Sequence, residues 1–374
     1  VVGILFFPLI MYCSFVYGNI MGLAFSALAI RLEIVYFQKH QVRYALCSGG
    51  AVLLALLFKS NYLVFFVGMV IYAFVEIISQ KKVKLLLLPL FFVVVFFIQS
   101  WTPVMLGEQV SGEKLDQGAS SWSWIAMGLQ QEGPLSPGWY NFYNQDSYAE
   151  SGYNTEVQTE MAKENIQQSL KYYWEHKGEA VRFFTQKTAS QWNNPSFQCF
   201  WLMQHHESPN FVMSEWAENF TNARNTYRGT LLLNLLQFVI LVGALIYCLL
   251  YWKHLHYIRS LILPMIFIGG FLFHLFWEAK GQYTLSYFVL LIPCAAAGYS
   301  LLTNKLLLLC GKKYRTSFPK RLKKNWKSML SFAVLSVMMV VVIAVCYSGD
   351  KASYLTEDTE AYVQYVETVS EASS

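Results

Sequence analysis

The amino-acid sequence predicts an all-α integral membrane protein with about nine transmembrane helices and a mainly helical extracytoplasmic loop domain. Three features of the chain point to this fold class. Only 14% of its 374 residues are charged, whereas roughly a quarter are charged in a typical soluble domain. Hydrophobic residues make up 55% of the chain. They gather in unbroken runs rather than in the stripes of an amphipathic helix, and runs of about 18 apolar residues can cross a bilayer.

Nine such runs follow one another along the chain. The run 44–58 is the weakest, because it contains Ser48, Gly49 and Gly50. The chain opens at Val1 inside an apolar run, without an initiator Met or the basic segment of a signal peptide. We therefore expect an upstream part with further spans. The predicted spans are 1–17, 20–37, 44–58, 62–79, 85–101, 230–252, 260–277, 284–302 and 329–347.

Lysine and arginine concentrate in alternate connecting segments, which predicts the sidedness of the spans. The cytoplasmic clusters lie around Lys39, Lys81 and Lys253 and in the basic loop 303–328. The net charge of +5 comes from these cytoplasmic clusters. We expect the clusters to contact anionic lipid head groups of the bilayer and do not predict nucleic-acid binding. The predicted organisation is about five helices in 1–101, an extracytoplasmic loop domain in 102–228, about four helices in 229–347, and an acidic extracytoplasmic tail in 348–374.

The loop 102–228 is too long for a simple connector. Thr155 with Gln158 three residues later fits a capping box, so we expect a helix from Thr155 to a stop at Gly178. A second helix is expected over 179–192. The loop is rich in Trp and Tyr, whose faces suit sugar rings but equally suit membrane interfaces and a small core. His205-His206-Glu207 is interpreted as solvated surface, and the seven scattered cysteines form no pattern typical of a metal site or a disulfide framework.

A few ionisable residues fall inside or beside the apolar runs. Arg31 and Glu33 lie within the span 20–37, where structural pairing is the simplest interpretation. Glu76 is expected to extend towards Lys81 or Lys82 at the cytoplasmic end of its span.

Two rim segments on the predicted outer side are candidates for substrate binding. Lys59-Ser60-Asn61 could bind a phosphate through charge-assisted hydrogen bonds, or Lys59 could reach lipid head groups. In the second segment, His274 lies one helical turn before Glu278, and Lys280, Gln282 and Tyr283 follow. An acceptor, a cation and an amide at one place could hold a sugar hydroxyl and a phosphate together. An ordinary charged hairpin at a membrane rim is the alternative.

Three stretches carry a resemblance to a known family. They are 15–19, the stretch from Tyr173 through Lys187 to Trp192, and the stretch from Trp277 to Pro293. With the predicted topology, they resemble the C-terminal two-thirds of a polytopic GT-C glycosyltransferase of the protein O-mannosyltransferase and lipid A aminoarabinose transferase group. The chain departs from the family's pattern at three positions: Asn19 replaces a common aspartate, Gln282 an arginine, and Ser286 a frequent proline.

The resemblance implies transfer of a sugar from a polyprenyl-phosphate donor to a cell-envelope glycan or protein acceptor. The reaction would take place at the outer face of a multi-pass protein in the bacterial plasma membrane. The catalytic carboxylate is expected upstream of Val1. Some family members need a divalent metal, but no ligand cluster in this chain indicates one. Lys280 and Lys59 are expected to bind the donor phosphate. The expected substrate-orienting residues are Glu278, Gln282, Tyr283, His274, Asn19 and Asn61.

Two other functions stay open. A polysaccharide polymerase or ligase of the O-antigen type would normally carry arginines in its outer loops, and this chain has Arg182, Arg224 and Arg228 there. A non-enzymatic polytopic transporter would show internal repeats or paired helix breaks. Pro264 with Gly269 and Gly270 is one such break, without a matching partner in the first half of the chain.

Overall fold

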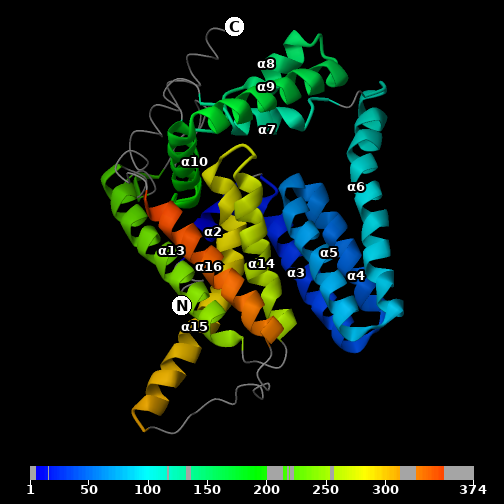
Figure 1. Cartoon of the computed structure of the whole chain (residues 1–374). Coiled ribbons are helices and arrows are strands. Elements are labelled where there is room, and N and C mark those ends of the chain that lie inside the picture. Colours follow the sequence, from blue (N-terminus) through cyan, green and yellow to red (C-terminus); the bar gives the residue numbers. More distant parts are fainter. Residues whose placement is uncertain are drawn as a thin grey trace. The chain divides into compact units, whose positions relative to one another are not determined.

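Every regular element in the described part of the chain is a helix, as the computed structural model shows (Figure 1). The described residues are 6–15, 17–115, 118–131, 136–199, 214–216, 219, 223–252, 257–311 and 326–348. Within them the one β-type pairing is an isolated parallel bridge between Trp139 and Ala279. The predicted all-α class is therefore confirmed.

Among the described residues, six helices are long and apolar enough to cross a membrane. Two further apolar helices are shorter: α4 (Val42–Phe58) and α14 (Tyr257–His274), where we predicted the spans 44–58 and 260–277. The predicted span 1–17 shows only α2 (Pro8–Met11) and the 3-10 turn η1 (Tyr12–Ser14) among its described residues. A multi-pass membrane protein is thus supported, while the number nine is not confirmed. The six long helices are α3 (Asn19–Lys39), α5 (Leu63–Gln80), α6 (Leu87–Ser111), α13 (Ala223–Tyr251), α15 (Gly281–Leu309) and α16 (Trp326–Ser348).

The chain divides into two compact units. The first comprises Val1–Leu115, Val239–Gly270 and Ser286–Val340, and the second comprises Asp116–Phe238, Phe271–Leu285 and Val341–Ser374. The second unit therefore includes the rim segment around Glu278 together with the large loop, which we had predicted to be separate parts.

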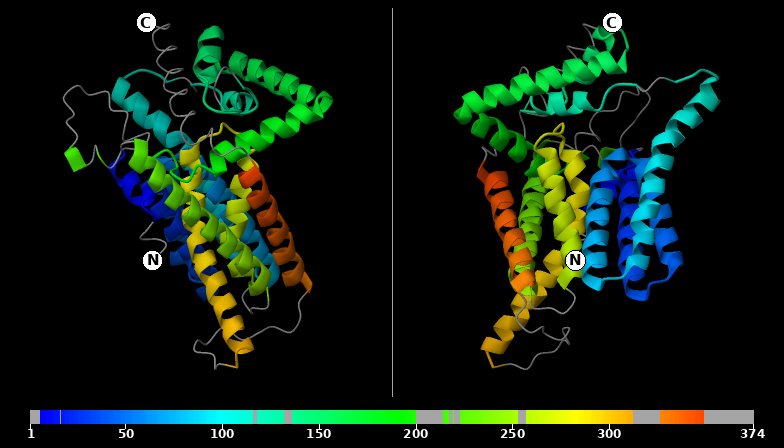
Figure 2. Two further views of the ribbon diagram at one scale, coloured as in Figure 1. Left: turned by 90° about the vertical axis from the view of Figure 1, so that its left-hand side faces the viewer. Right: turned by 45° about the vertical axis from the view of Figure 1, so that its right-hand side comes forward.

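In the first unit, α3, α4, α5 and α6 lie side by side (Figure 2). The Ser48-Gly49 pair that weakened the prediction for α4 lies at this packing interface. The Ser48 hydroxyl donates to the Ala29 carbonyl oxygen at 3.0 Å, and a Cβ on Gly49 would lie 2.2 Å from the Phe91 ring. Small residues let helices approach closely inside a membrane, so this feature supports packing rather than arguing against a span.

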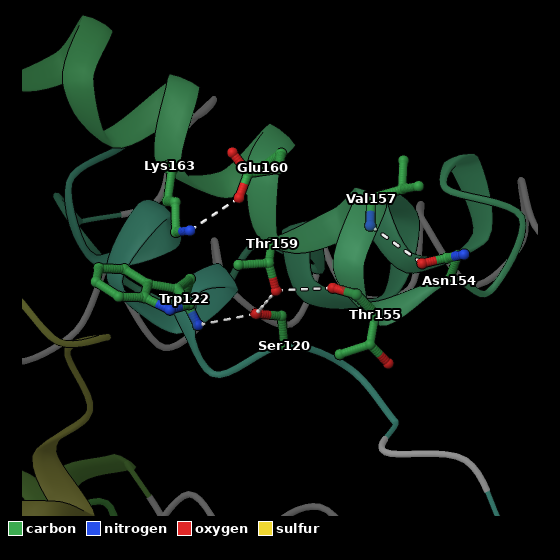
Figure 3. Close-up of polar contacts among 8 residues, drawn as sticks. All are labelled: Ser120, Trp122, Asn154, Thr155, Val157, Thr159, Glu160 and Lys163. Atoms are coloured by element: carbon green, nitrogen blue, oxygen red, sulfur yellow. Dashed lines mark hydrogen bonds and ion pairs between the residues drawn. The ribbon is translucent and has the colours of Figure 1, made fainter.

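In the second unit, α7 (Trp122–Gly128) and α8 (Tyr143–Glu150) pack on α9 (Thr155–Glu175), which is followed by α10 (Lys177–Trp192). The predicted cap was wrong by one residue. Asn154 has an extended backbone, and its Oδ1 accepts hydrogen bonds from the backbone N–H groups of Glu156 and Val157. Figure 3 shows the bond from Val157. The Thr155 hydroxyl instead donates to the Gly118 carbonyl oxygen.

The remaining boundaries of the loop also differ from the prediction. Gly178 does not stop the first helix, because α9 ends at Glu175 and Gly178 lies in the first turn of α10. Helix α6 continues past residue 101, through Pro103, to Ser111. The basic residues of 312–325, the acidic tail from residue 349 on, Trp201 and His205-His206-Glu207 lie outside the described residues.

Candidate functional site

The rim segment is anchored to the large loop by its backbone. It connects the end of α14 with the start of α15. The Ala279 N–H donates to the Gly138 carbonyl oxygen at 2.7 Å, beside the bridge between Trp139 and Ala279. A Cβ on Gly128 would lie 2.3 Å from the Phe276 carbonyl oxygen, so only glycine fits there. The segment is therefore held in a defined geometry, as a binding site requires.

Glu278 is almost completely buried, with 1% of its surface exposed. The Tyr283 hydroxyl donates to Glu278 Oε2 at 3.0 Å. The Tyr283 ring stacks on the buried His274 ring, with centroids 5.7 Å apart and an interplanar angle of 18°. Three of the predicted site residues are thus brought together. The contacts also show that Glu278 positions the hydroxyl of the half-buried Tyr283.

Lys187 is the charged neighbour that the prediction of site residues omitted. This α10 residue is 1% exposed, and its Nζ donates to the carbonyl oxygens of Gly128 and Leu275, the latter at 3.1 Å. Burial lowers the pKa of Lys187 to about 7, and the charge of Glu278 opposes this shift. Its position one turn after Phe183, on the buried face of α10, is the sequence signal that could have identified it.

Lys280 is the accessible cation of the segment. It is half-buried, and its Nζ lies 5.5 Å from the centroid of the Tyr140 ring. The Tyr140 hydroxyl accepts a hydrogen bond from Gln145 Nε2 at 2.9 Å. Burial, then the negative charges of Glu278 and Asp146, raise the pKa of Tyr140, so this phenol stays protonated at neutral pH.

Aromatic rings also stack at Trp277, in the same segment. The half-buried Trp277 ring stacks on Trp124 with centroids 6.4 Å apart, and on Phe273 with centroids 5.0 Å apart. Gln282, which stands where the family pattern has an arginine, is buried, and its backbone N–H donates to Gln198 Oε1 at 3.3 Å. Gln282 Oε1 is buried without a hydrogen-bond partner among the described residues. The positive charge of this segment therefore comes from Lys280.

The other predicted site residues lie together in the first unit. Lys59 Nζ donates to the side-chain oxygen of Asn19, forty positions earlier in the chain. The Tyr62 hydroxyl donates to the Asn19 carbonyl oxygen and lies 2.7 Å from the Ser286 hydroxyl. Lys59 Nζ also lies 5.9 Å from the centroid of the Tyr17 ring. The side-chain amide nitrogens of Asn19 and Asn61 are buried without a hydrogen-bond partner among the described residues.

The predicted site residues therefore form two groups. Lys59, Asn19 and Asn61 belong to the first unit, while His274, Glu278, Lys280, Gln282 and Tyr283 belong to the second. A single phosphate site built from Lys59 and Lys280 stays a prediction. Among the described residues, no group of three or more His, Cys, Asp or Glu side chains could hold a metal ion.

Comparison of the chain with protein families, with curated proteins and with solved structures finds no match.

Proposed function

We propose that the chain is the substrate-binding part of a GT-C-like membrane glycosyltransferase. It would move a sugar from a polyprenyl-phosphate donor to a glycan or protein acceptor at the outer face of the bacterial plasma membrane. One observation carries the proposal. The half-buried cation of Lys280 stands on a rigid segment, over the Tyr140 ring, with the stacked Trp277 three residues before it in the chain.

This arrangement suits a sugar phosphate. An ammonium group can stabilise the charge that develops on the departing lipid phosphate, and a preorganised position increases that effect. The Trp277 and Tyr140 rings offer faces for a sugar, and the Tyr283 hydroxyl, held by Glu278, offers a hydrogen bond to a sugar oxygen. The buried Lys187 lies behind this surface and supports it through two backbone carbonyl groups.

The rest of the reaction follows from the family resemblance. A carboxylate of the enzyme would deprotonate the acceptor hydroxyl, which would attack the anomeric carbon with inversion while the lipid phosphate departs. In this proposal Lys59, held by Asn19, is a second cation for the donor phosphate. Asn61 and Gln282 would orient the substrate.

The test is donor consumption by the full-length protein in membranes containing polyprenyl-phosphate-linked sugar. Lys280→Ala should lower the rate on the order of 100-fold if it removes one preorganised charge contact in the transition state. Lys280→Arg should restore part of the rate. Lys177→Ala is the matched control, because Lys177 is an exposed lysine of the same unit whose Nζ lies 5.2 Å from the Trp174 ring centroid. Equal rates for wild type and Lys280→Ala would refute the site.

A transporter is the second candidate, and one observation favours it. Glu33, Glu76 and Arg259 are ionisable groups within apolar helices, where such groups often mark a transport pathway. Substrate flux into vesicles without sugar transfer would support this function. A polymerase or ligase would need free arginines in its outer loops. Of the predicted arginines, Arg182 is engaged in a surface ion pair with Glu179 at 2.6 Å, and Arg228 is exposed.

A further inference from the structure

Glu33 lies inside the apolar helix α3, about 9 Å before the helix end at Lys39 by the 1.5 Å rise per residue. Its side chain is completely buried, with 0% of its surface exposed. Neither carboxyl oxygen has a hydrogen-bond partner among the described residues. A bare carboxylate in such a place is very costly, so a carboxyl group there needs a proton or a cation.

Glu76 on α5 is the other buried carboxyl group at this place, and its charge acts on Glu33. Its environment is the opposite of that of Glu33. The Tyr72 hydroxyl donates to Glu76 Oε1 at 2.9 Å, and Gln80 Nε2 donates to Oε2 at 2.9 Å. Arg259 Nε lies 3.5 Å from Oε1. Glu76 is therefore stabilised as an anion, contrary to the expectation that it would extend to Lys81 or Lys82.

The elements packed around Glu33 supply few other polar groups. From its own helix, Arg31 points to the exposed side, and the Tyr36 hydroxyl donates to the Lys84 carbonyl oxygen. From α5 come Tyr72, whose ring contacts Phe37, and the Glu76–Gln80 pair. The buried face of α4 presents Ser48 among glycine and aliphatic side chains, and the Ser48 hydroxyl donates to the Ala29 carbonyl oxygen. Among the described residues, the ion pair at this place joins Arg259 to Glu76.

We propose that Glu33 is a proton-binding site of the membrane helices, with the Glu76–Arg259 pair as the fixed charge beside it. In the protonated state, one proton resides on the Glu33 carboxyl group and the pair of glutamates carries one negative charge, which Arg259 balances. On release the O–H bond of Glu33 breaks, the proton passes to water, and two carboxylates face one guanidinium group. In this second state the two carboxylates repel each other, and Arg259 offsets only part of the repulsion. Proton occupancy of Glu33 is therefore sensitive to any movement of Arg259. The proposal does not rest on the glycosyltransferase function.

Infrared difference spectroscopy of the full-length protein in lipid nanodiscs tests this site. The wild type should show the C=O stretch of a protonated carboxylic acid that shifts in D₂O and disappears as the pH is raised. Glu33→Gln should remove this band. Glu76→Gln should leave it in place, and the exposed Glu175→Gln is the control for spectral changes unrelated to the site. If Glu33→Gln does not accumulate, Glu33→Asp should move the band instead of removing it.

Three results would overturn the proposal. The wild-type protein could lack the band at every pH. The band could persist in Glu33→Gln or vanish in Glu76→Gln, which would place the proton elsewhere. Finally, sodium chloride could displace the band at constant pH, with potassium chloride inactive, which would identify Glu33 as a ligand of a sodium ion rather than a holder of a proton.

Discussion

Lys187 Nζ donates a hydrogen bond to the carbonyl oxygen of Leu275, eighty-eight positions later in the chain, at 3.1 Å. A second bond from the same nitrogen reaches the Gly128 carbonyl oxygen, so one buried ammonium group connects α10, the end of α7 and the rim segment. The geometry of the segment that carries Glu278 and Lys280 therefore depends on a residue that contributes nothing to the exposed surface.

This lysine predicts a particular pH dependence of stability. Its pKa falls from the ordinary 10.5 to about 7 in the folded protein, mainly through burial. Between about pH 7 and pH 10.5 the unfolded chain binds more protons at this site than the folded chain, so stability rises with pH. Below about pH 7 both states are protonated, and the full cost of the buried charge is present. We expect the wild-type Tm in detergent to rise from pH 7 to pH 9.5 relative to that of Lys187→Met.

The comparison isolates one group, because the substitution keeps an unbranched side chain, one atom shorter, and removes its titration. The absolute Tm of Lys187→Met is not the readout, since the variant also loses two hydrogen bonds. If the Tm values of the two proteins changed in parallel across this pH range, the prediction that Lys187 is buried and titrates near pH 7 would be wrong.

Gly128 is predicted to be essential for the anchoring of the rim segment. A Cβ there would lie 2.3 Å from the Phe276 carbonyl oxygen and 2.6 Å from the Trp277 carbonyl carbon, both of which are backbone atoms. Gly128→Ala should therefore separate α7 from the segment and lower the Tm by several degrees, in the range typical of a 1–3 kcal/mol overpacking cost. Gly178→Ala is the matched control, since a Cβ at Gly178 meets nothing within 4 Å. That variant should keep or raise the Tm, because alanine favours a helix. A Gly128→Ala protein as stable as Gly178→Ala would show that the contact is not held in solution.

The helix cap at Asn154 can be tested in the same unit. Asn154→Ala should cost about 1 kcal/mol, because the N–H groups of Glu156 and Val157 lose their acceptor. Asn154→Ser should cost only a few tenths, because serine caps nearly as well. Thermal unfolding followed by circular dichroism of the two variants provides the measurement. Equal losses for alanine and serine would mean that the side chain acts by another route.

The helices could be predicted from the sequence more completely than the candidate site. A long apolar run can be predicted to be a helix without knowing what it packs against, because the bilayer imposes helical structure on it. Six of the predicted spans coincide with helices of membrane-crossing length. The start of α9 was harder to predict, because Asn154 and Thr155 are both good N-cap residues. The Thr155 hydroxyl donates to the Gly118 carbonyl oxygen, which leaves Asn154 as the N-cap.

The site depended on contacts that no local pattern encodes. Glu278 and Lys280 stood out as charges at a membrane rim, but Lys187 lies in an amphipathic helix where a lysine is normally assigned to the solvent. Glu76 was expected to reach the nearest lysines in sequence. Its cation is instead Arg259 on α14, and only the packing of distant helices places that residue.

The pair of Tyr62 and Ser286 offers a test of the first unit. Their hydroxyl oxygens lie 2.7 Å apart in a buried contact, and Tyr62 also donates to the Asn19 carbonyl oxygen. Gly22 makes room for this ring, since a Cβ there would lie 2.2 Å from it. Tyr62→Phe removes the partner of the buried Ser286 hydroxyl and should cost about 1–3 kcal/mol. Ser286→Ala should cost less, because the Tyr62 hydroxyl still donates to the Asn19 carbonyl oxygen. The double variant removes both hydroxyl groups, so its loss should be smaller than the sum of the single losses, by at least about 0.5 kcal/mol. Additive losses for Tyr62→Phe and Ser286→Ala in a Tm-based cycle would show that the hydroxyl contact contributes no coupling.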